Sequence, residues 1–170
     1  MPRLHVCSLA LISKTVAKTG ARSLVTLLSP GTEVERPAGI RPERHLYLAL
    51  SDIVEPMPGQ VLPDAAHLEG LLGFVRAWDR AEPMVIHCFA GVSRSTAAAY
   101  IAACALRPDR DEFAIAKALR AASPTASPNG HLVALADEAL GRRGRMNEAI
   151  AAIGRGDACF EGRPFALELS

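Results

Sequence analysis

The chain has 170 residues, of which 49% are hydrophobic and 22% charged, and its formal net charge is +1. This length suits one domain with a sizeable core, and the near-neutral charge gives no reason to expect nucleic acid or a membrane surface as a partner. Four irregularly spaced cysteines and the lack of a long uncharged apolar run argue against a disulfide-linked secreted scaffold and a transmembrane span. We therefore expect a soluble, cytoplasmic protein.

Apolar runs alternate with helical patterns along the chain. In chain order, this predicts strands at 4–8, 23–28, 45–50 and 84–87, and helices at 9–18, 64–80, 95–106, 111–122, 128–140 and 147–153. Residues 155–170 have no clear pattern and are assigned to a C-terminal tail that follows a single domain at 1–154. The alternation predicts an α/β fold with a central, mainly parallel sheet flanked by helices. Functional loops then lie at the carboxyl ends of the strands.

The segment from His87 to Thr96, with the sequence HCFAGVSRST, carries the chemistry. A strand leads into Cys88, a short loop returns through Gly91 to Arg94, and a helix follows. Converging backbone amides and the positive end of the helix dipole make such a turn an anion site. Helix N-termini and nearby cations favour the thiolate form of a cysteine, and a guanidinium can hold two phosphate oxygens at once.

Context separates this segment from chance matches. Cys104 and Arg110 have the same spacing, but there is no glycine between them and no histidine before the cysteine. The loop also lacks the Gly-Lys-Ser/Thr ending of nucleotide-binding phosphate loops. The segment resembles the His-Cys-x-x-Gly-x-x-Arg-Ser/Thr motif of cysteine-based protein tyrosine phosphatases, of the compact dual-specificity or bacterial type. The resemblance covers about residues 46–140 and includes Pro128-Asn129 before a late helix.

Each residue of the segment has an expected role in a phosphatase. Cys88 is the nucleophile and Arg94 binds the phosphoryl oxygens. His87 orients the loop and helps to keep the thiolate, and Ser95 donates a hydrogen bond to the departing thiolate or, alternatively, caps the helix. The substrate phosphate is held by the loop backbone, contributed by Phe89, Ala90, Gly91, Val92, Ser93 and Arg94. The expected reaction is hydrolysis of phosphoprotein monoesters, chiefly phosphotyrosine, with dual specificity left open.

The acid that protonates the leaving oxygen must come from another segment. Asp52 follows the strand at 45–50, which places it on the same rim as Cys88, and its distance of 36 residues upstream resembles the acid loop of these phosphatases. The Trp-Pro-Asp tripeptide of the larger tyrosine phosphatases is absent. Glu55 and Asp64 are rivals, although Asp64 suits a helix cap and Glu55 a solvated loop.

Other classes of protein share parts of this sequence pattern. A phosphate-binding module without turnover would use the same cradle, and rhodanese-type sulfurtransferases also place a cysteine in an anion loop, usually a shorter one. Cys7 has Ser13 where low-molecular-weight tyrosine phosphatases need arginine, which excludes that subfamily. The histidines lack zinc-site spacing, so neither a metal nor another cofactor is expected. Cys7 is a candidate partner for an oxidised Cys88, because neighbouring strands lie about 5 Å apart.

Overall fold

In a computed structural model, which describes residues 2–170, five strands form one sheet in the order β3-β2-β4-β1-β5. The strands are β1 (Arg3–Ser8), β2 (Ser23–Leu28), β3 (His45–Ala49), β4 (Met84–Cys88) and β5 (Phe165–Glu168). The first four are parallel, and β5 runs antiparallel to β1. The predicted α/β fold with a mainly parallel sheet is therefore confirmed.

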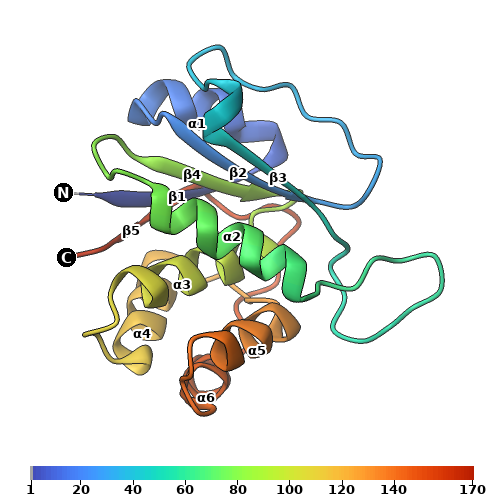
Figure 1. Cartoon of the computed structure of the whole chain (residues 1–170), viewed down its shortest axis with the longest axis vertical. Coiled ribbons are helices and arrows are strands. Elements are labelled where there is room, and N and C mark those ends of the chain that lie inside the picture. Colours follow the sequence, from blue (N-terminus) through green and yellow to red (C-terminus); the bar gives the residue numbers. More distant parts are fainter. Residues whose placement is uncertain (1) are drawn as a thin grey trace.

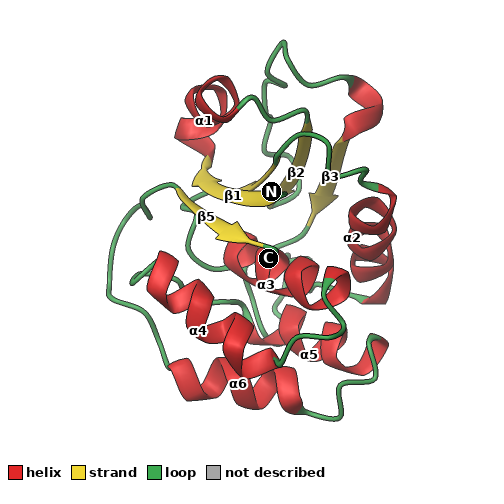
Figure 2. Cartoon of the chain, turned by 90° about the vertical axis from the view of Figure 1, so that its left-hand side faces the viewer, coloured by secondary structure: helices red, strands yellow, loops and turns green. Residues whose placement is uncertain are grey.

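The helices cover the two faces of the sheet unequally, as Figure 1 shows. They are α1 (Ile12–Thr19), α2 (Ala65–Ala77), α3 (Arg94–Leu106), α4 (Glu112–Ala122), α5 (Gly130–Ala139) and α6 (Arg145–Ile153), with short 3-10 turns at Leu9–Leu11 and Pro42–Arg44. Helix α1 packs alone on one face, and α2 to α6 lie on the other (Figures 1 and 2). Among residues 2–170, no helix is long and apolar enough to span a membrane.

Helix α3 is the centre of the larger layer. All of its residues except Ala105 are buried, as expected for a helix that is apolar nearly all round. Because α3 begins directly after the loop that follows β4, the middle of the sheet and the middle of the helical layer meet at Cys88. The site predicted from sequence therefore rests on the most buried part of the fold.

Two details differ from the sequence-based prediction. Ser127 was expected to cap a helix with Pro128 as its first residue, but α5 begins at Gly130. The side chain of Asn129 caps it by accepting from the backbone N–H groups of His131 and Leu132. Residues Phe165–Glu168, where the sequence has no clear pattern, form β5 because their backbone pairs with the free edge of β1.

A buried ion cluster joins α4 to the segment around α6. Glu112, 3% exposed, accepts from Arg142 at 2.6 Å and from Arg145 at 3.2 Å. Burial alone would raise the pKa of Glu112, but the two guanidinium groups outweigh it and lower the pKa to about 2. Arg142 also donates to the carbonyl oxygen of Cys104 at 2.7 Å, which links the cluster to α3.

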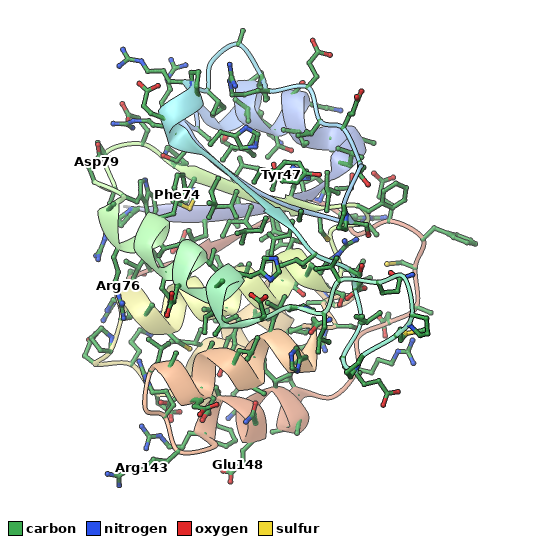
Figure 3. The ribbon with its side chains drawn as sticks, turned by 45° about the vertical axis from the view of Figure 1, so that its right-hand side comes forward. Tyr47, Phe74, Arg76, Asp79, Arg143 and Glu148 are labelled. Carbon is green, nitrogen blue, oxygen red and sulfur yellow. The ribbon has the colours of Figure 1, made fainter. Side chains whose placement is uncertain are left out.

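We expect Glu112→Gln to lower the free energy of unfolding by about 3–5 kcal/mol, because it leaves the buried Arg142 without its counter-charge. Urea unfolding at pH 7 measures the loss. Glu148→Gln on α6 is the matched control, since Glu148 is exposed (Figure 3) and should change stability by less than about 0.5 kcal/mol. Equal effects of the two substitutions would contradict a structural role for the cluster.

Candidate active site

Strand β4 ends at Cys88, the cysteine of the candidate site. Its backbone pairs with β1 on one side and β2 on the other, and the Cys88 side chain is only 2% exposed. The next five residues, 89–93, form a tight loop, called the Cys88 loop below, and Arg94 opens α3. The structure therefore brings the cysteine, the loop and the arginine together at the carboxyl end of the sheet.

Gly91 permits the sharp turn of the Cys88 loop. Its φ of +72° is a conformation that side-chain-bearing residues rarely adopt. A Cβ atom at this position would also lie 2.9 Å from the carbonyl carbon of Cys7 and 3.0 Å from the backbone nitrogen of Ser8. Both the backbone angle and the close approach of β1 therefore require glycine here.

The Cys88 loop is held by its carbonyl groups. Those of Phe89, Ala90, Val92 and Ser93 accept from backbone N–H groups of Leu9, Gly162, Ser127 and Asn129 at 2.9–3.2 Å. In the described chain, no backbone N–H from Phe89 to Arg94 donates to a protein acceptor. The peptide units thus turn their oxygens toward the surrounding protein and leave their amides free, which is the arrangement that holds an anion.

Arg94 lies under this cradle with part of its guanidinium unused. The side chain is anchored from the sheet, because its Nη1 donates to the Leu50 carbonyl oxygen at 3.0 Å and to the Ser29 hydroxyl at 3.3 Å. The residue is only 7% exposed, yet its Nε has no partner. It is the one buried side-chain nitrogen or oxygen of residues 2–170 left unbonded. A buried unbonded donor is rare, and an anion in the cradle would satisfy this one.

Ser95 lies beside the thiol. Its hydroxyl is 3.1 Å from the sulfur of Cys88, and the residue is fully buried. No side-chain cap begins α3, so helix capping, the alternative role considered for a serine here, is not what this side chain does. The hydroxyl is placed to hydrogen-bond whichever charge state the sulfur takes.

His87 begins a buried chain of hydrogen bonds behind Cys88. Its Nδ1 is 3.1 Å from the Cys88 carbonyl oxygen, and its Nε2 is 2.7 Å from the hydroxyl of Thr26 on β2. The same hydroxyl is 2.7 Å from Nε2 of His45 on β3. A carbonyl only accepts, so Nδ1 of His87 carries the proton. Its Nε2 then accepts from Thr26, and Thr26 accepts from His45.

This chain explains why His87 remains neutral. Burial lowers the pKa of His87 to about 4, the positive charge of Arg94 and that of His45 when it is protonated lower it further, and the bond to the Cys88 carbonyl opposes the change. A proton on Nε2 would also face the hydrogen of the Thr26 hydroxyl and break the chain. The His87 ring is thus held in one tautomer between the Cys88 carbonyl and Thr26, and its orienting role stays a prediction.

Asp52 reaches the Cys88 loop from the segment after β3. Its Oδ1 accepts from the hydroxyl of Ser93 at 2.7 Å and from the side-chain amide of Asn129 at 3.0 Å. Asn129 also donates to the Ile53 carbonyl oxygen at 3.1 Å, and its backbone N–H binds Ser93. In the described chain Oδ2 of Asp52 bonds no protein group. One oxygen therefore binds Ser93 of the Cys88 loop, and the other has no protein partner.

The two rival carboxylates lie elsewhere. Asp64 caps α2, since its Oδ1 accepts from the backbone N–H of His67 at 3.0 Å while the His67 ring accepts from the Asp64 backbone. Glu55 is exposed and lines a groove beside the Cys88 loop. Neither has a hydrogen bond to the Cys88 loop, which favours Asp52 as the acid.

Cys7 is poorly placed as a partner for Cys88. It pairs with His87 across β1 and β4 and packs on the α1 face of the sheet, whereas Cys88 packs on the α3 face. Burial also raises the pKa of Cys7 to about 11, even though a hydrogen bond from Thr15 opposes this. The two thiols thus project from opposite faces, and Cys7 is in its unreactive form at neutral pH.

Several contributors to the site lie outside the predicted set. Asn129 precedes a glycine and belongs to a residue type that caps helices, so the sequence indicates it as a possible cap. Ser127 has the same property, and the sequence alone does not decide between them. No sequence pattern indicates that Thr26, His45 and Ser29 belong to the site. They lie near it only because β2 pairs with its neighbouring strands. Among residues 2–170, no three histidine, cysteine or acidic side chains gather as a metal site would require.

Comparison with known proteins identifies the fold. No family model and no curated protein matches the sequence. Solved structures do match. A mouse putative dual specificity phosphatase, solved with zinc tungstate, is 19% identical, with a TM-score of 0.62 and 86% of each chain covered. The PTP-2 phosphatase of Cydia pomonella is 21% identical, with a TM-score of 0.61, over 79% of this chain and 84% of its own.

Human DUSP28 is 20% identical, with a TM-score of 0.56, over 89% of this chain and 95% of its own. The chain therefore has the fold of the dual-specificity and tyrosine phosphatases, as its Cys88 segment implied. At these identities the likeness establishes the fold alone.

We expect the fold to lose stability as the pH falls from about 6.5 to 4. The unfolded chain takes up a proton on His87 near pH 6.5, but the folded protein does so only near 4, so acid favours unfolding. The loss attributable to His87 reaches up to about 3 kcal/mol at the acid end. NMR titration of the His87 imidazole gives the folded-state value, and urea unfolding at pH 7 and pH 5 gives the loss. A ring that protonates near 6.5 in the folded protein would contradict the chain of hydrogen bonds.

Proposed function

We propose that this chain is a phosphoprotein monoester phosphatase, acting chiefly on phosphotyrosine through a cysteinyl-phosphate intermediate. One observation carries the proposal: a buried cysteine, backbone amides without protein acceptors and the unbonded Nε of Arg94 all belong to the seven consecutive residues 88–94. Phosphoryl transfer depends on positioning and on neutralising the charge of the equatorial oxygens. The cradle offers donors for these oxygens and a nucleophile below them.

In the first step the Cys88 thiolate attacks phosphorus, an S–P bond forms, and the P–O ester bond breaks. The Cys88 loop amides and Arg94 hold the three phosphoryl oxygens in place. Asp52 donates the proton that the leaving oxygen needs. The clamp on its Oδ1 leaves Oδ2 as the proton-bearing atom, which fits an acid that must face the ester oxygen rather than the loop.

In the second step water attacks phosphorus and the S–P bond breaks. Asp52, now a carboxylate, accepts the proton from that water, and inorganic phosphate leaves. The hydroxyl of Ser95, 3.1 Å from the sulfur, donates a hydrogen bond to the thiolate as it departs. His87 keeps the Cys88 backbone in position through both steps by its bond to the carbonyl.

Hydrolysis of a small aryl phosphate under reducing conditions tests this mechanism. We expect Cys88→Ser to lower kcat by more than about 10³-fold, because the hydroxyl is a far weaker nucleophile. Asp52→Asn should lower kcat by about 10²–10⁴-fold, because it removes the acid while keeping the hydrogen-bonding shape. Asp64→Asn is the matched control and should keep the wild-type rate, since Asp64 serves as a helix cap.

Binding of inorganic tungstate, a tetrahedral oxyanion, separates an enzyme from a phosphate-binding module. Arg94→Lys should weaken tungstate binding by losing the guanidinium fork, whereas Asp52→Asn should leave it intact. A wild-type protein that binds tungstate through Arg94 but never hydrolyses an aryl phosphate would be the binding module.

Equal rates on matched phosphotyrosine, phosphoserine and phosphothreonine peptides would show dual specificity instead of tyrosine preference.

A further inference from the structure

An open groove of about 980 Å³ lies beside the Cys88 loop. It begins at Asp52 and Ser93, the pair that joins the proposed acid to the loop. From there it runs between the segment after β3 and the segment that follows α6. Its volume is at the upper end of the range for ligand pockets, about 300–1,000 Å³. Whatever binds in the groove is therefore next to a phosphoryl group held over Cys88.

The groove presents apolar side chains that no part of this chain covers. Val54 and Met57, on the segment after β3, line it and are 60% and 51% exposed. Ile150 of α6 and Ala158, beyond α6, also contribute to the lining. Single exposed apolar residues are ordinary. Here two large apolar side chains, Val54 and Met57, lie in the same wall of the groove, and further apolar atoms line it. Together they form a concave apolar surface.

The segment beyond α6, residues 155–162, of which 155–159 line the groove, is fixed in place. The backbone N–H of Gly156 donates to the Ser127 hydroxyl at 3.0 Å, and that of Gly162 to the Ala90 carbonyl oxygen at 2.9 Å. A Cβ atom on Gly162 would lie 2.8 Å from the Gly91 carbonyl oxygen, so this segment touches the Cys88 loop directly. Figure 2 shows the segment passing along one side of the molecule between α6 and β5. The groove is thus preformed, which favours binding.

The charge of the groove limits what can occupy it. Three acidic side chains line it, those of Asp52, Glu55 and Asp157, against one basic side chain, that of Arg155. A second phosphate group or a polyphosphorylated headgroup would meet net repulsion there. An uncharged, apolar group suits both the charge and the lining.

We propose that this groove binds a large apolar side chain of a peptide substrate, within three residues of the phosphorylated one. The proposal rests on the function proposed above and adds a preference for leucine, isoleucine, methionine or phenylalanine near the phosphate. An extended peptide advances about 3.3–3.6 Å per residue, so a side chain one to three positions away reaches about 10 Å from the phosphorylated residue. The peptide backbone then crosses the site at Asp52 and Ser93.

Two phosphotyrosine peptides of equal charge test this preference, one with leucine and one with serine at the three positions on each side of the phosphorylated residue. We expect kcat/KM to be about tenfold higher for the leucine peptide, equivalent to about 1.4 kcal/mol. The double variant Val54→Ser, Met57→Ser should reduce this ratio to about two or less. Matched controls are Val61→Ser and Phe160→Ser, which remove exposed apolar side chains from the same two segments but outside the groove lining. Both controls should keep the wild-type ratio.

The outcomes separate this inference from the function on which it rests. Hydrolysis of a small aryl phosphate reports only on the chemistry at Cys88. If that hydrolysis occurs and the peptide ratio is near one, the groove proposal is wrong and the phosphatase stands. If no hydrolysis occurs, the affinity of the two peptides for the Cys88→Ser protein gives the same ratio without turnover. Equal or undetectable affinities there, or tighter binding to vesicles containing phosphoinositide than to either peptide, would overturn the proposal.

Discussion

The orientation of four peptide units decides what this site can do. In the Cys88 loop the carbonyl oxygens point outward to donors on other segments, so the amides face the centre. Those donors come from the end of β1, the segment before β5, and the residues leading into α5. A loop of five residues cannot hold itself in this conformation. The cradle therefore exists only when strands and helices from both ends of the chain have assembled around it.

The same assembly accounts for the buried polar groups near the site. Thr26, 0% exposed, bonds two histidine rings, and Asn129 uses its side-chain oxygen to cap α5 and its amide to hold Asp52. Among residues 2–170, every buried side-chain nitrogen and oxygen other than Nε of Arg94 has a hydrogen-bond partner, as stable interiors require. Against that background the unbonded Nε of Arg94 is informative. The Arg94 side chain is anchored through Nη1, and the function proposed above assigns its unbonded Nε to the phosphoryl oxygens.

The sequence predicted the parts of the site that are contiguous. Four of these residues lie within one stretch of eight: His87, Cys88, Gly91 and Arg94. Each has a position that local structure defines, at the end of a strand, in a turn or at the start of a helix. The parts that depend on tertiary contacts were less accessible. Ser127 and Asn129 both belong to residue types that cap helices. Asn129 caps α5, whereas the hydroxyl of Ser127 accepts from the backbone N–H of Gly156. Residues Phe165–Glu168 are too few to signal a strand without the edge of β1.

The pairing of β5 with β1 sets where the two ends of the chain leave the molecule. Arg3 is opposite Glu168 in the register and forms an ion pair with it at 2.8 Å, so the ends emerge side by side, as Figure 1 shows. They do so at the edge of the sheet opposite the Cys88 loop, because β1 runs toward that loop and β5 away from it. A short linker can therefore join them, which makes the architecture suited to circular permutation. For the same reason, a tether or second domain attached at either end leaves the mouth of the groove open.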